Sequence, residues 1–349
     1  MIQKLEIEGY RCFEKLTVEG LASLNLIVGK NNSGKSSMLE CIQLLSSSKP
    51  KADLHSILER RGELATDSST SPVLFQPESL FFTRSARIGS RIALSNDCGN
   101  RFSVSIKANN QNIDVPGLNR PGSMLIESSN GAADTFDIDE NGYAEIGSKQ
   151  RSFFAQIGGP NPRTLPRPFI PNTSFPLDQI RALWEELKLQ GREDEVLAIL
   201  RELDSDIEYI DFFNTVGNTN GHVKLKSLGK YVPLGTLGDG TSRLFALAVA
   251  AATHSDDVLL VDEIDTGFHY STLSQVWQML YKFSLASETQ IFATTHSQDC
   301  VEAFANLVRD DIAHSADLSL QRVVKGKSHA VTYSGDALLG AVKFDYEVR

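Results

Sequence analysis

The chain has 349 residues, of which 41% are hydrophobic, so it is long enough to bury a sizeable core in one large domain or two. With 34 Lys and Arg against 44 Asp and Glu, the formal net charge is −10, which argues against a broad non-specific nucleic-acid surface. The four cysteines form no Cys-x-x-Cys pair and predict neither a zinc site nor a disulfide framework, so we expect a reducing, cytoplasmic compartment.

The first residues alternate between apolar and polar side chains. The apolar positions at 2–7 and 16–18 predict two strands joined by a polar corner. Because this start is charged as well as alternating, it is unlike a signal peptide. The apolar run at 24–28 then predicts a short buried strand.

The stretch GKNNSGKSS at 29–37 fits the pattern Gly-x-x-x-x-Gly-Lys-Ser/Thr. A strand is predicted before it and apolar residues at helical spacing follow it, so the motif falls on a strand-to-helix turn. Backbone N–H groups at such a turn, together with the helix dipole, favour a bound anion. Lys35 would reach the β- and γ-phosphates of a nucleotide, and the Ser36 hydroxyl would bind Mg²⁺. The residues assigned to this nucleotide site are Gly29, Lys30, Asn31, Asn32, Ser33, Gly34, Lys35, Ser36 and Ser37.

The middle of the chain is less regular. Residues 46–72 predict a short helix and a loop, and 80–107 predict strands, whereas the Asn-, Gly- and Pro-rich stretch 108–175 predicts an irregular insertion with short strands. Apolar stripes at 177–190 and 193–203 predict two helices that pair in a small lobe. Such stripes usually pack against a core, and a partner surface is the alternative.

The sequence LGDGT at 237–241 precedes another helical pattern and predicts a second anion-binding helix start. One chain needs only one phosphate cradle per nucleotide. We therefore expect the second anion-binding helix start to bind the nucleotide of another subunit. The apolar run that follows, 244–252, is too short to cross a bilayer, and we expect no membrane association.

Four apolar residues at 258–261 precede Asp262 and Glu263, as in a buried parallel strand that ends in two carboxylates. The end of such a strand faces the nucleotide in open α/β sheets. Asp262 would support the Mg²⁺ shell, and Glu263 would accept a proton from the attacking water or orient it. A solvated strand end is the alternative for an Asp-Glu pair considered alone.

In QIFATTHSQDCVEAF, which begins at 290, a further apolar strand ends in His296. The His296 side chain would contact the γ-phosphate or the water, and a surface or core role is the alternative for a lone histidine. After His296 we expect a helix at 298–308, a hairpin turning at Gly326 and a short tail. These 53 residues (349 minus 296) are too few for a separate nuclease domain, so we expect no nuclease activity from this chain alone.

These motifs, in this order, resemble an ABC-type ATPase head of the SMC/RecF/OLD group, and in particular the compact AAA-labelled ATPases of bacterial anti-phage and abortive-infection systems. The resemblance implies an α/β P-loop NTPase head with an N-terminal β-subdomain and a helical lobe insertion. Its N-terminal half would be 1–107, the insertion and lobe 108–222, and its C-terminal half 223–349. The resemblance implies Walker A at 29–37, Walker B at 259–263 and a D-loop region at 265–269.

The resemblance also assigns residues that the patterns alone do not. Arg11 would lie near the nucleotide, Gln76 would be a Q-loop ligand of the metal, and His296 would be the H-loop switch. Gly238 stands where transporters and SMC proteins carry serine, so backbone N–H groups there, or Thr241 or Arg243, would replace that hydroxyl. His269 matches OLD-like relatives, with a structural role as the alternative. The signature residues assigned to nucleotide binding are Gly238, Asp239, Gly240 and Thr241.

Three functions follow as hypotheses. The first is an ATPase, using ATP and Mg²⁺, that forms a homodimer or larger homo-oligomer around ATP and controls an effector protein (a nuclease or toxin) in trans. The second is a RecF- or SMC-like DNA-repair or DNA-end ATPase, for which exposed arginines would form a basic strip, unless they are an ordinary solvated sheet face. The third is a non-hydrolysing scaffold, against which the complete motif set argues. The arginines of the strip are Arg84, Arg87, Arg91 and Arg101.

Overall fold

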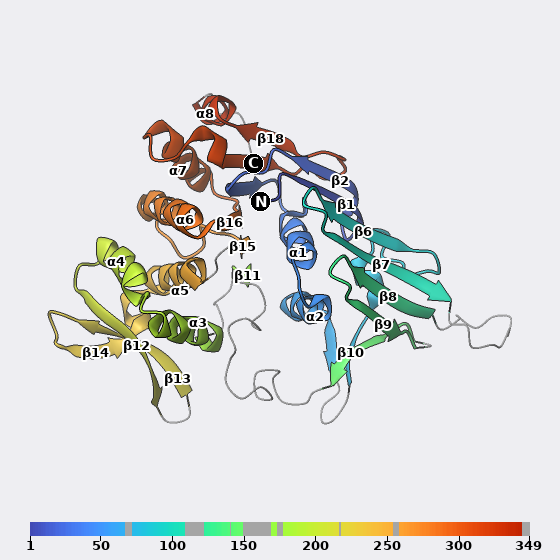
Figure 1. Ribbon diagram of the computed structural model, residues 1–349, viewed down its shortest axis with the longest axis horizontal. Coiled ribbons are helices and arrows are strands. Elements are labelled where there is room, and N and C mark those ends of the chain that lie inside the picture. Colours follow the sequence, from blue (N-terminus) through green and yellow to red (C-terminus); the bar gives the residue numbers. More distant parts are fainter. Residues whose placement is uncertain are drawn as a thin grey trace. The chain divides into compact units, whose positions relative to one another are not determined.

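The computed structural model describes residues 1–66, 72–108, 122–139, 141–148, 169–172, 177–215, 218–253 and 258–343. The chain forms two compact units, each built from separate stretches of sequence (Figure 1). Among the described residues, no helix combines the length and the apolar character needed to cross a membrane. Unit 1 comprises Met1–Leu21, Gly29–Asn161 and Arg322–Thr332, and unit 2 comprises Ala22–Val28, Pro162–Gln321 and Tyr333–Arg349.

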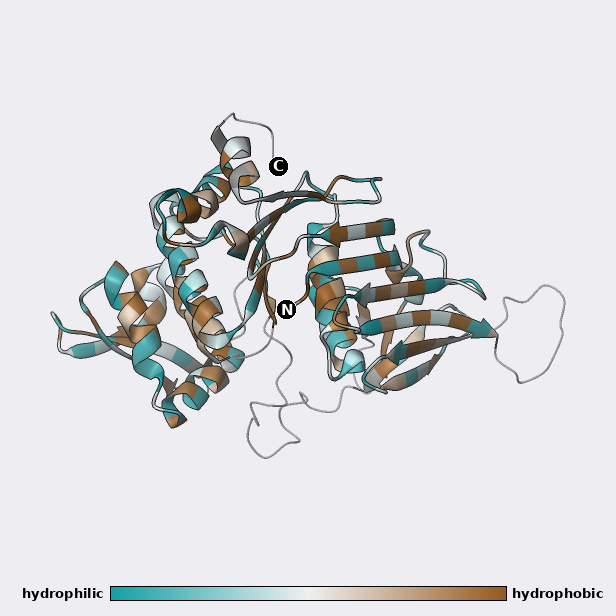
Figure 2. Cartoon of the chain, turned by 45° about the horizontal axis from the view of Figure 1, so that its top comes forward, coloured by the Kyte–Doolittle hydropathy of each residue, from teal (hydrophilic) through white to brown (hydrophobic). Residues whose placement is uncertain are grey.

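Unit 1 contains a six-stranded antiparallel sheet in the order β2-β1-β6-β7-β8-β9. Hydrophobic and hydrophilic residues alternate along its strands (Figure 2), so one face is apolar. This face packs on helix α1 (Lys35–Leu45), through β6 and β7. The strands are β1 (Lys4–Tyr10), β2 (Phe13–Glu19), β6 (Arg91–Asn96), β7 (Arg101–Ala108), β8 (Gly122–Ser128) and β9 (Ala133–Asp137).

Unit 1 also contains a second helix and a smaller sheet. Helix α2 (Pro50–Arg60) packs on α1, and a small sheet has the order β10-β5-β4. Its strands are β4 (Leu64–Thr66), β5 (Pro72–Phe75) and β10 (Ala144–Ser148), and the short helix η1 (Pro77–Leu80) follows β5. The described part of the predicted insertion thus supplies strands to both sheets of unit 1, so its first half is part of a regular β-structure.

Unit 2 is built on a sheet in the order β11-β15-β16-β3-β17-β18, in which the pairs from β11 to β3 are parallel. Every residue of β3, β15 and β16 is buried. Because these strands are parallel, their carboxyl ends lie at one edge of the sheet. In the sequence, Gly29 directly follows β3, Asp262 directly follows β15, and His296 comes two residues after the end of β16. The strands are β11 (Phe169–Ile170), β15 (Val258–Val261), β16 (Gln290–Thr294), β3 (Leu24–Val28), β17 (Leu318–Arg322) and β18 (Val331–Ser334).

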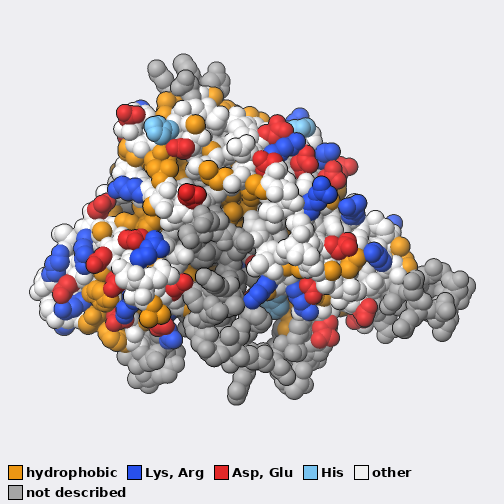
Figure 3. Space-filling view, viewed as in Figure 1, with side chains coloured by type: hydrophobic (Ala, Val, Ile, Leu, Met, Phe, Trp, Pro, Cys, Tyr) orange, Lys and Arg blue, Asp and Glu red, His pale blue; other side chains and the backbone are white. Residues whose placement is uncertain are grey.

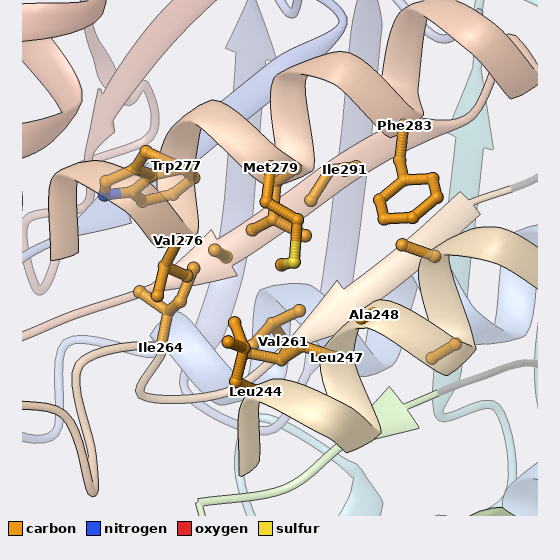
Figure 4. Close-up of a cluster of buried hydrophobic side chains, with 14 of the residues drawn as sticks. Leu244, Leu247, Ala248, Val261, Ile264, Val276, Trp277, Met279, Phe283 and Ile291 are labelled. Atoms are coloured by element: carbon orange, nitrogen blue, oxygen red, sulfur yellow. The ribbon is translucent and has the colours of Figure 1, made fainter. Parts of the chain in front are cut away.

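The helices of unit 2 cover this sheet. Figure 4 shows side chains of α5 and α6 packed around Val261 and Ile291 of the sheet. The α/β class predicted for the chain is confirmed by this arrangement. The helices are α5 (Asp239–Thr253), α6 (Leu273–Ser287), α7 (Gln298–Arg309) and α8 (Asp336–Lys343), with short helices η4 (Leu234–Leu237), η5 (Tyr270–Thr272) and η6 (Ser315–Asp317).

The predicted helical lobe is part of the core of unit 2. Helices α3 (Leu177–Leu189) and α4 (Glu193–Leu203) pack on α5. The Trp184 ring of α3 lies 5.2 Å from the Phe245 ring of α5, and both side chains are fully buried. The apolar stripes therefore serve core packing. An antiparallel sheet of β12 (Ile207–Thr215), β13 (Asn218–Leu225) and β14 (Lys230–Pro233) completes the lobe.

Candidate nucleotide-binding site

The phosphate loop in unit 1 has the backbone that its glycines predict. Gly29 has φ 151°, Asn32 has φ 59° and Gly34 has φ 108°, and helix α1 begins directly after Gly34. A Cβ at Gly34 would overlap the Phe13 ring and the Cys12 sulfur, so both conformation and space require glycine there. The strand-loop-helix prediction is confirmed.

Lys35 is buried, and its ammonium group folds back over the loop. Nζ donates hydrogen bonds to the carbonyl oxygens of Gly29 (2.8 Å) and Lys30 (3.3 Å). Lys30, Asn31 and Asn32 are exposed. An ammonium group that lies over exposed main chain at the start of a helix can bind an anion. Ser36 is half-buried in the first turn of α1, and Ser37 behind it is buried.

The sheet corner behind the loop carries a buried ion-pair network centred on Glu40 of α1. Its carboxylate lies 2.8 Å from Arg11 Nε and 2.7 Å from Arg61 Nε, and it accepts a hydrogen bond from the Tyr10 hydroxyl (2.9 Å). Arg11 Nη1 also lies 2.8 Å from Glu63. Burial alone opposes the charged guanidinium, but Tyr10, Glu40 and Glu63 together raise the pKa of Arg11.

Arg11 therefore connects the β1–β2 corner to α1 and to the segment after α2, and 9% of its side chain is exposed. Its role near the nucleotide stays a prediction. Arg61 also donates to the Ser37 hydroxyl (3.3 Å), which ties the network to the first turn of α1. Sequence reasoning missed Glu40 on α1, and Arg61 and Glu63 after α2, because charged residues on helices and in loops are normally solvated.

In unit 2, Asp262 and Glu263 follow β15 and are held by the end of the neighbouring strand. The Thr294 hydroxyl donates to Asp262 Oδ1 (2.6 Å) and accepts from the Glu263 N–H (2.8 Å). The Glu263 backbone is left-handed, with φ 47°. Such a conformation is costly for a residue other than glycine and is often found where function requires it. Thr294 was not predicted, although its place at the end of the apolar strand before His296 is a usable signal.

The predicted signature region lies at the start of α5. Gly238 has φ 93° and precedes the helix, and Gly238 and Asp239 are exposed. The Thr241 hydroxyl donates to the Leu237 carbonyl (3.3 Å) within its own turn. A Cβ at Gly240 would lie 2.9 Å from the Gly267 carbonyl, so the helix start and the D-loop region are in close contact.

Arg243 does not point toward the exposed start of α5. Its Nη2 donates to the carbonyl oxygens of Asp262 (3.0 Å) and Glu263 (2.9 Å), and Nη1 donates to that of Pro171 (3.0 Å). The expectation that Arg243 replaces the missing signature serine is therefore wrong for this structure, because its guanidinium binds carbonyl groups of its own chain.

The remaining predicted residues lie at element ends. His296 is exposed and stands next to Ser297, which caps α7 by accepting from the Cys300 N–H (3.3 Å). Gln76 is exposed in unit 1, between β5 and η1. His269 Nδ1 lies 2.8 Å from the Ser271 hydroxyl in its own turn, and its role stays a prediction.

Comparison with known proteins agrees with this geometry. The profile of the family described as "AAA domain, putative AbiEii toxin, Type IV TA system" matches residues 24–299. The chain belongs to this family. An "ATP/GTP phosphatase" of Helicobacter pylori is 24% identical over 350 residues, which cover 91% of each chain.

Solved structures share the fold. An SMC head bound to the C-terminal winged-helix domain of ScpA matches with a TM-score of 0.52 and 17% identity, over 97% of this chain and 99% of that one. The SMC head domain from Thermotoga maritima matches with a TM-score of 0.43 and 13% identity, over 96% and 98%. The family match and the SMC-head fold both agree with the P-loop motif of this chain.

Proposed function

We propose that the protein hydrolyses ATP with Mg²⁺. Lys35 and the backbone N–H groups of its loop bind the phosphates, Ser36 and Asp262 hold the metal, and Glu263 orients the attacking water. Mg²⁺, when bound, neutralises charge on the phosphate oxygens. A hydroxyl and a carboxylate are the ligands that Mg²⁺ takes beside phosphates, so these residues fit the metal. The left-handed Glu263, held by Thr294, is the observation that most supports this proposal.

Glu263→Gln tests the assignment, because it keeps the shape and removes the charge that orients water. We expect normal ATP binding with phosphate release lowered at least 100-fold, an effect in the range of electrostatic catalytic groups. ATP and GTP should be compared, since the Helicobacter relative is named for both. Glu302→Gln, on the exposed face of α7, is the control. Wild-type turnover by Glu263→Gln would refute the role of Glu263.

We further propose that two chains pair around two ATP molecules, with LGDGT of one chain closing on the phosphate loop of the other. The exposed start of α5 supports this, because Gly238 and Asp239 are exposed and the start of a helix favours a bound anion. The interface would be isologous, so each chain would contribute a half to both sites.

We also propose that ATP binding and hydrolysis by this chain control the activity of a cytoplasmic effector protein in anti-phage defence. The family description names a toxin and a toxin–antitoxin system, which supports an effector. We place the docking surface on the lobe at 176–213 or the insertion before it. At the two ends of α3, Leu189 is 90% exposed and Leu177 is 47% exposed.

The product of the neighbouring gene should co-purify with this protein if the effector proposal holds. Leu189→Glu should then weaken the complex, whereas Leu285→Glu, at an exposed apolar position of α6, should not. Equal capture by both variants would contradict docking on the lobe.

A DNA-repair or DNA-end ATPase is the second candidate. Arg84, Arg87, Arg91 and Arg101 are all exposed in unit 1, as a basic strip requires. On the face seen in Figure 3, however, Lys and Arg side chains are interspersed with Asp and Glu. We therefore favour the effector proposal. Binding to DNA that weakens steeply with salt would favour the second candidate instead.

A further inference from the structure

Arg243 lies in the first turns of α5 in an unusual environment for a cation. Among the described residues, its guanidinium donates only to main-chain carbonyl groups, those of Pro171, Asn172, Asp262 and Glu263. Its Nε is buried without a hydrogen-bond partner among the described residues. Desolvation lowers the pKa of Arg243, while Asp265, Glu263 and Asp262 favour the charged form at longer range. Burying a charged guanidinium without a carboxylate partner costs free energy, so we asked what the buried Arg243 side chain does for the carbonyl groups that it binds.

The carbonyls that it binds belong to the turn that carries the water-orienting carboxylate. Glu263 has a left-handed backbone, which persists only where surrounding groups hold it. Thr294 Oγ1 binds the Glu263 N–H, and Arg243 Nη2 binds the Glu263 carbonyl. These two contacts hold the residue from both of its peptide groups. The Glu263 carbonyl also accepts from the Thr266 N–H (3.0 Å), and the Thr266 hydroxyl donates to Glu263 Oε2 (3.3 Å).

The same region of α5 touches this turn elsewhere. The close approach of Gly240 to the Gly267 carbonyl leaves no room for a side chain at position 240. In Figure 4, Leu244 and Leu247 of α5 face Val261, at the end of β15, and Ile264 lies nearby. The start of α5 and the turn at 262–267 are therefore packed as one body within unit 2.

We propose that Arg243 is a positioning residue for ATP hydrolysis: by holding the carbonyls of Asp262 and Glu263, it keeps the Glu263 carboxylate aimed at the attacking water and links it to the start of α5. This inference rests on the proposed ATPase function. Two nitrogen atoms of one planar guanidinium reach carbonyls on two segments, 171–172 and 262–263. A lysine ammonium is a single point and cannot reproduce this fork.

The test compares wild type with Arg243→Lys, Arg243→Ala and Arg309→Ala. Arg309 is the control, because it is exposed at the end of α7 and forms an ion pair with Asp310, far in sequence from Glu263. We expect the kcat of Arg243→Lys to fall by between about 10- and 100-fold, as for a small misplacement of a catalytic group. The KM for ATP should change by less than about twofold, because the phosphate loop does not depend on Arg243.

Two further measurements separate positioning from general stability. Nε makes no hydrogen bond within the described part of the chain, so free guanidinium supplies the donors seen for Arg243. Millimolar guanidinium should therefore partly restore the kcat of Arg243→Ala. In hydrogen exchange, peptides over 258–268 should exchange faster in Arg243→Lys, while peptides over 29–45 should match wild type.

The exchange measurement does not depend on turnover, so it separates the two proposals. A wild-type protein that releases no phosphate would refute the ATPase proposal, and exchange at 258–268 would still decide whether Arg243 holds the turn. Unchanged exchange together with a wild-type kcat in Arg243→Lys would overturn the inference. So would an equal rise in exchange across the whole chain, because it would mean that Arg243 acts on global stability alone.

Discussion

The Thr294 hydroxyl joins the ends of two parallel strands, because it donates to Asp262 Oδ1 at 2.6 Å while it accepts from the Glu263 N–H at 2.8 Å. A single hydroxyl thus orients a proposed metal ligand and the backbone of a proposed catalytic residue. Valine has the same shape without these hydrogen bonds, so the pair can be tested by one substitution.

Thr294→Val should lower the free energy of unfolding by about 1–3 kcal/mol, since it leaves a buried N–H without its acceptor. The kcat for ATP should fall as well, by roughly 10-fold, because the Glu263 N–H loses the hydrogen bond that holds it. Denaturant unfolding and phosphate release measure the two effects. Thr253→Val, which removes a hydroxyl bonded within α5, should lose little activity.

Lys35→Ala should abolish ATP binding, because it removes the amine that lies over the phosphate loop. Titration of a fluorescent ATP analogue, with and without Mg²⁺, measures the affinity. Lys327→Ala removes an exposed lysine of the same unit and should bind as wild type does. Retained affinity in Lys35→Ala would mean that the nucleotide binds elsewhere.

Gly34→Ala and Gly62→Ala form a matched pair, since both glycines have positive φ but only Gly34 lacks space for a Cβ. At Gly62 we expect a loss of about 1–2 kcal/mol from backbone strain. Gly34 should lose roughly 1–3 kcal/mol more, because the new methyl group overlaps Phe13 and Cys12. Equal losses of unfolding free energy would show that the loop can relax away from these neighbours.

Pairing of two chains around ATP should be detectable in the Glu263→Gln variant, because slow hydrolysis would make the ATP-bound state accumulate. We expect the mass from light scattering to double when ATP and Mg²⁺ are added. Replacement of exposed Gly238 by Arg should prevent the doubling, because a long side chain at the start of α5 would block the second chain. The same mass with and without ATP would contradict pairing driven by nucleotide.

Glu40→Gln should be strongly destabilising, because it leaves Arg11 and Arg61 without the carboxylate between them. Breaking a buried ion pair on one side typically costs about 3–5 kcal/mol. Glu59→Gln, at an exposed position of α2, should cost less than about 0.5 kcal/mol. Thermal unfolding of both variants gives the comparison.

The parts of the site that were predictable from sequence are those encoded by local patterns. The turn at 29–35 needs two glycines and a following helix, and the strand at 258–261 needs four apolar residues before its carboxylates, so each can be read from a few neighbouring residues. Helical periodicity likewise predicted α3 and α4, which the structure has at Leu177–Leu189 and Glu193–Leu203.

The contacts that hold the site in place join residues far apart in the sequence. Thr294 meets Asp262 only because β16 pairs with β15, and Arg243 meets Glu263 only because α5 packs on that strand. In the sequence, both look like ordinary polar residues. The strands within the insertion were hard to predict for a similar reason. The composition of 108–175 predicts irregular structure, whereas in the structure β8 pairs with β7 and β9 pairs with β8 in one sheet.

The place of β3 also bears on how the chain can be made. This strand ends at Val28, yet it pairs with β16 at 290–294, and the Asn25 side chain donates to the Ile291 carbonyl across 266 positions of sequence. During synthesis, this fully buried strand therefore cannot pair with β16 until residues 290–294 have been made. An unpaired apolar strand is prone to aggregate, so ribosome-bound or truncated chains that stop before β16 should depend on chaperones far more than the finished protein does.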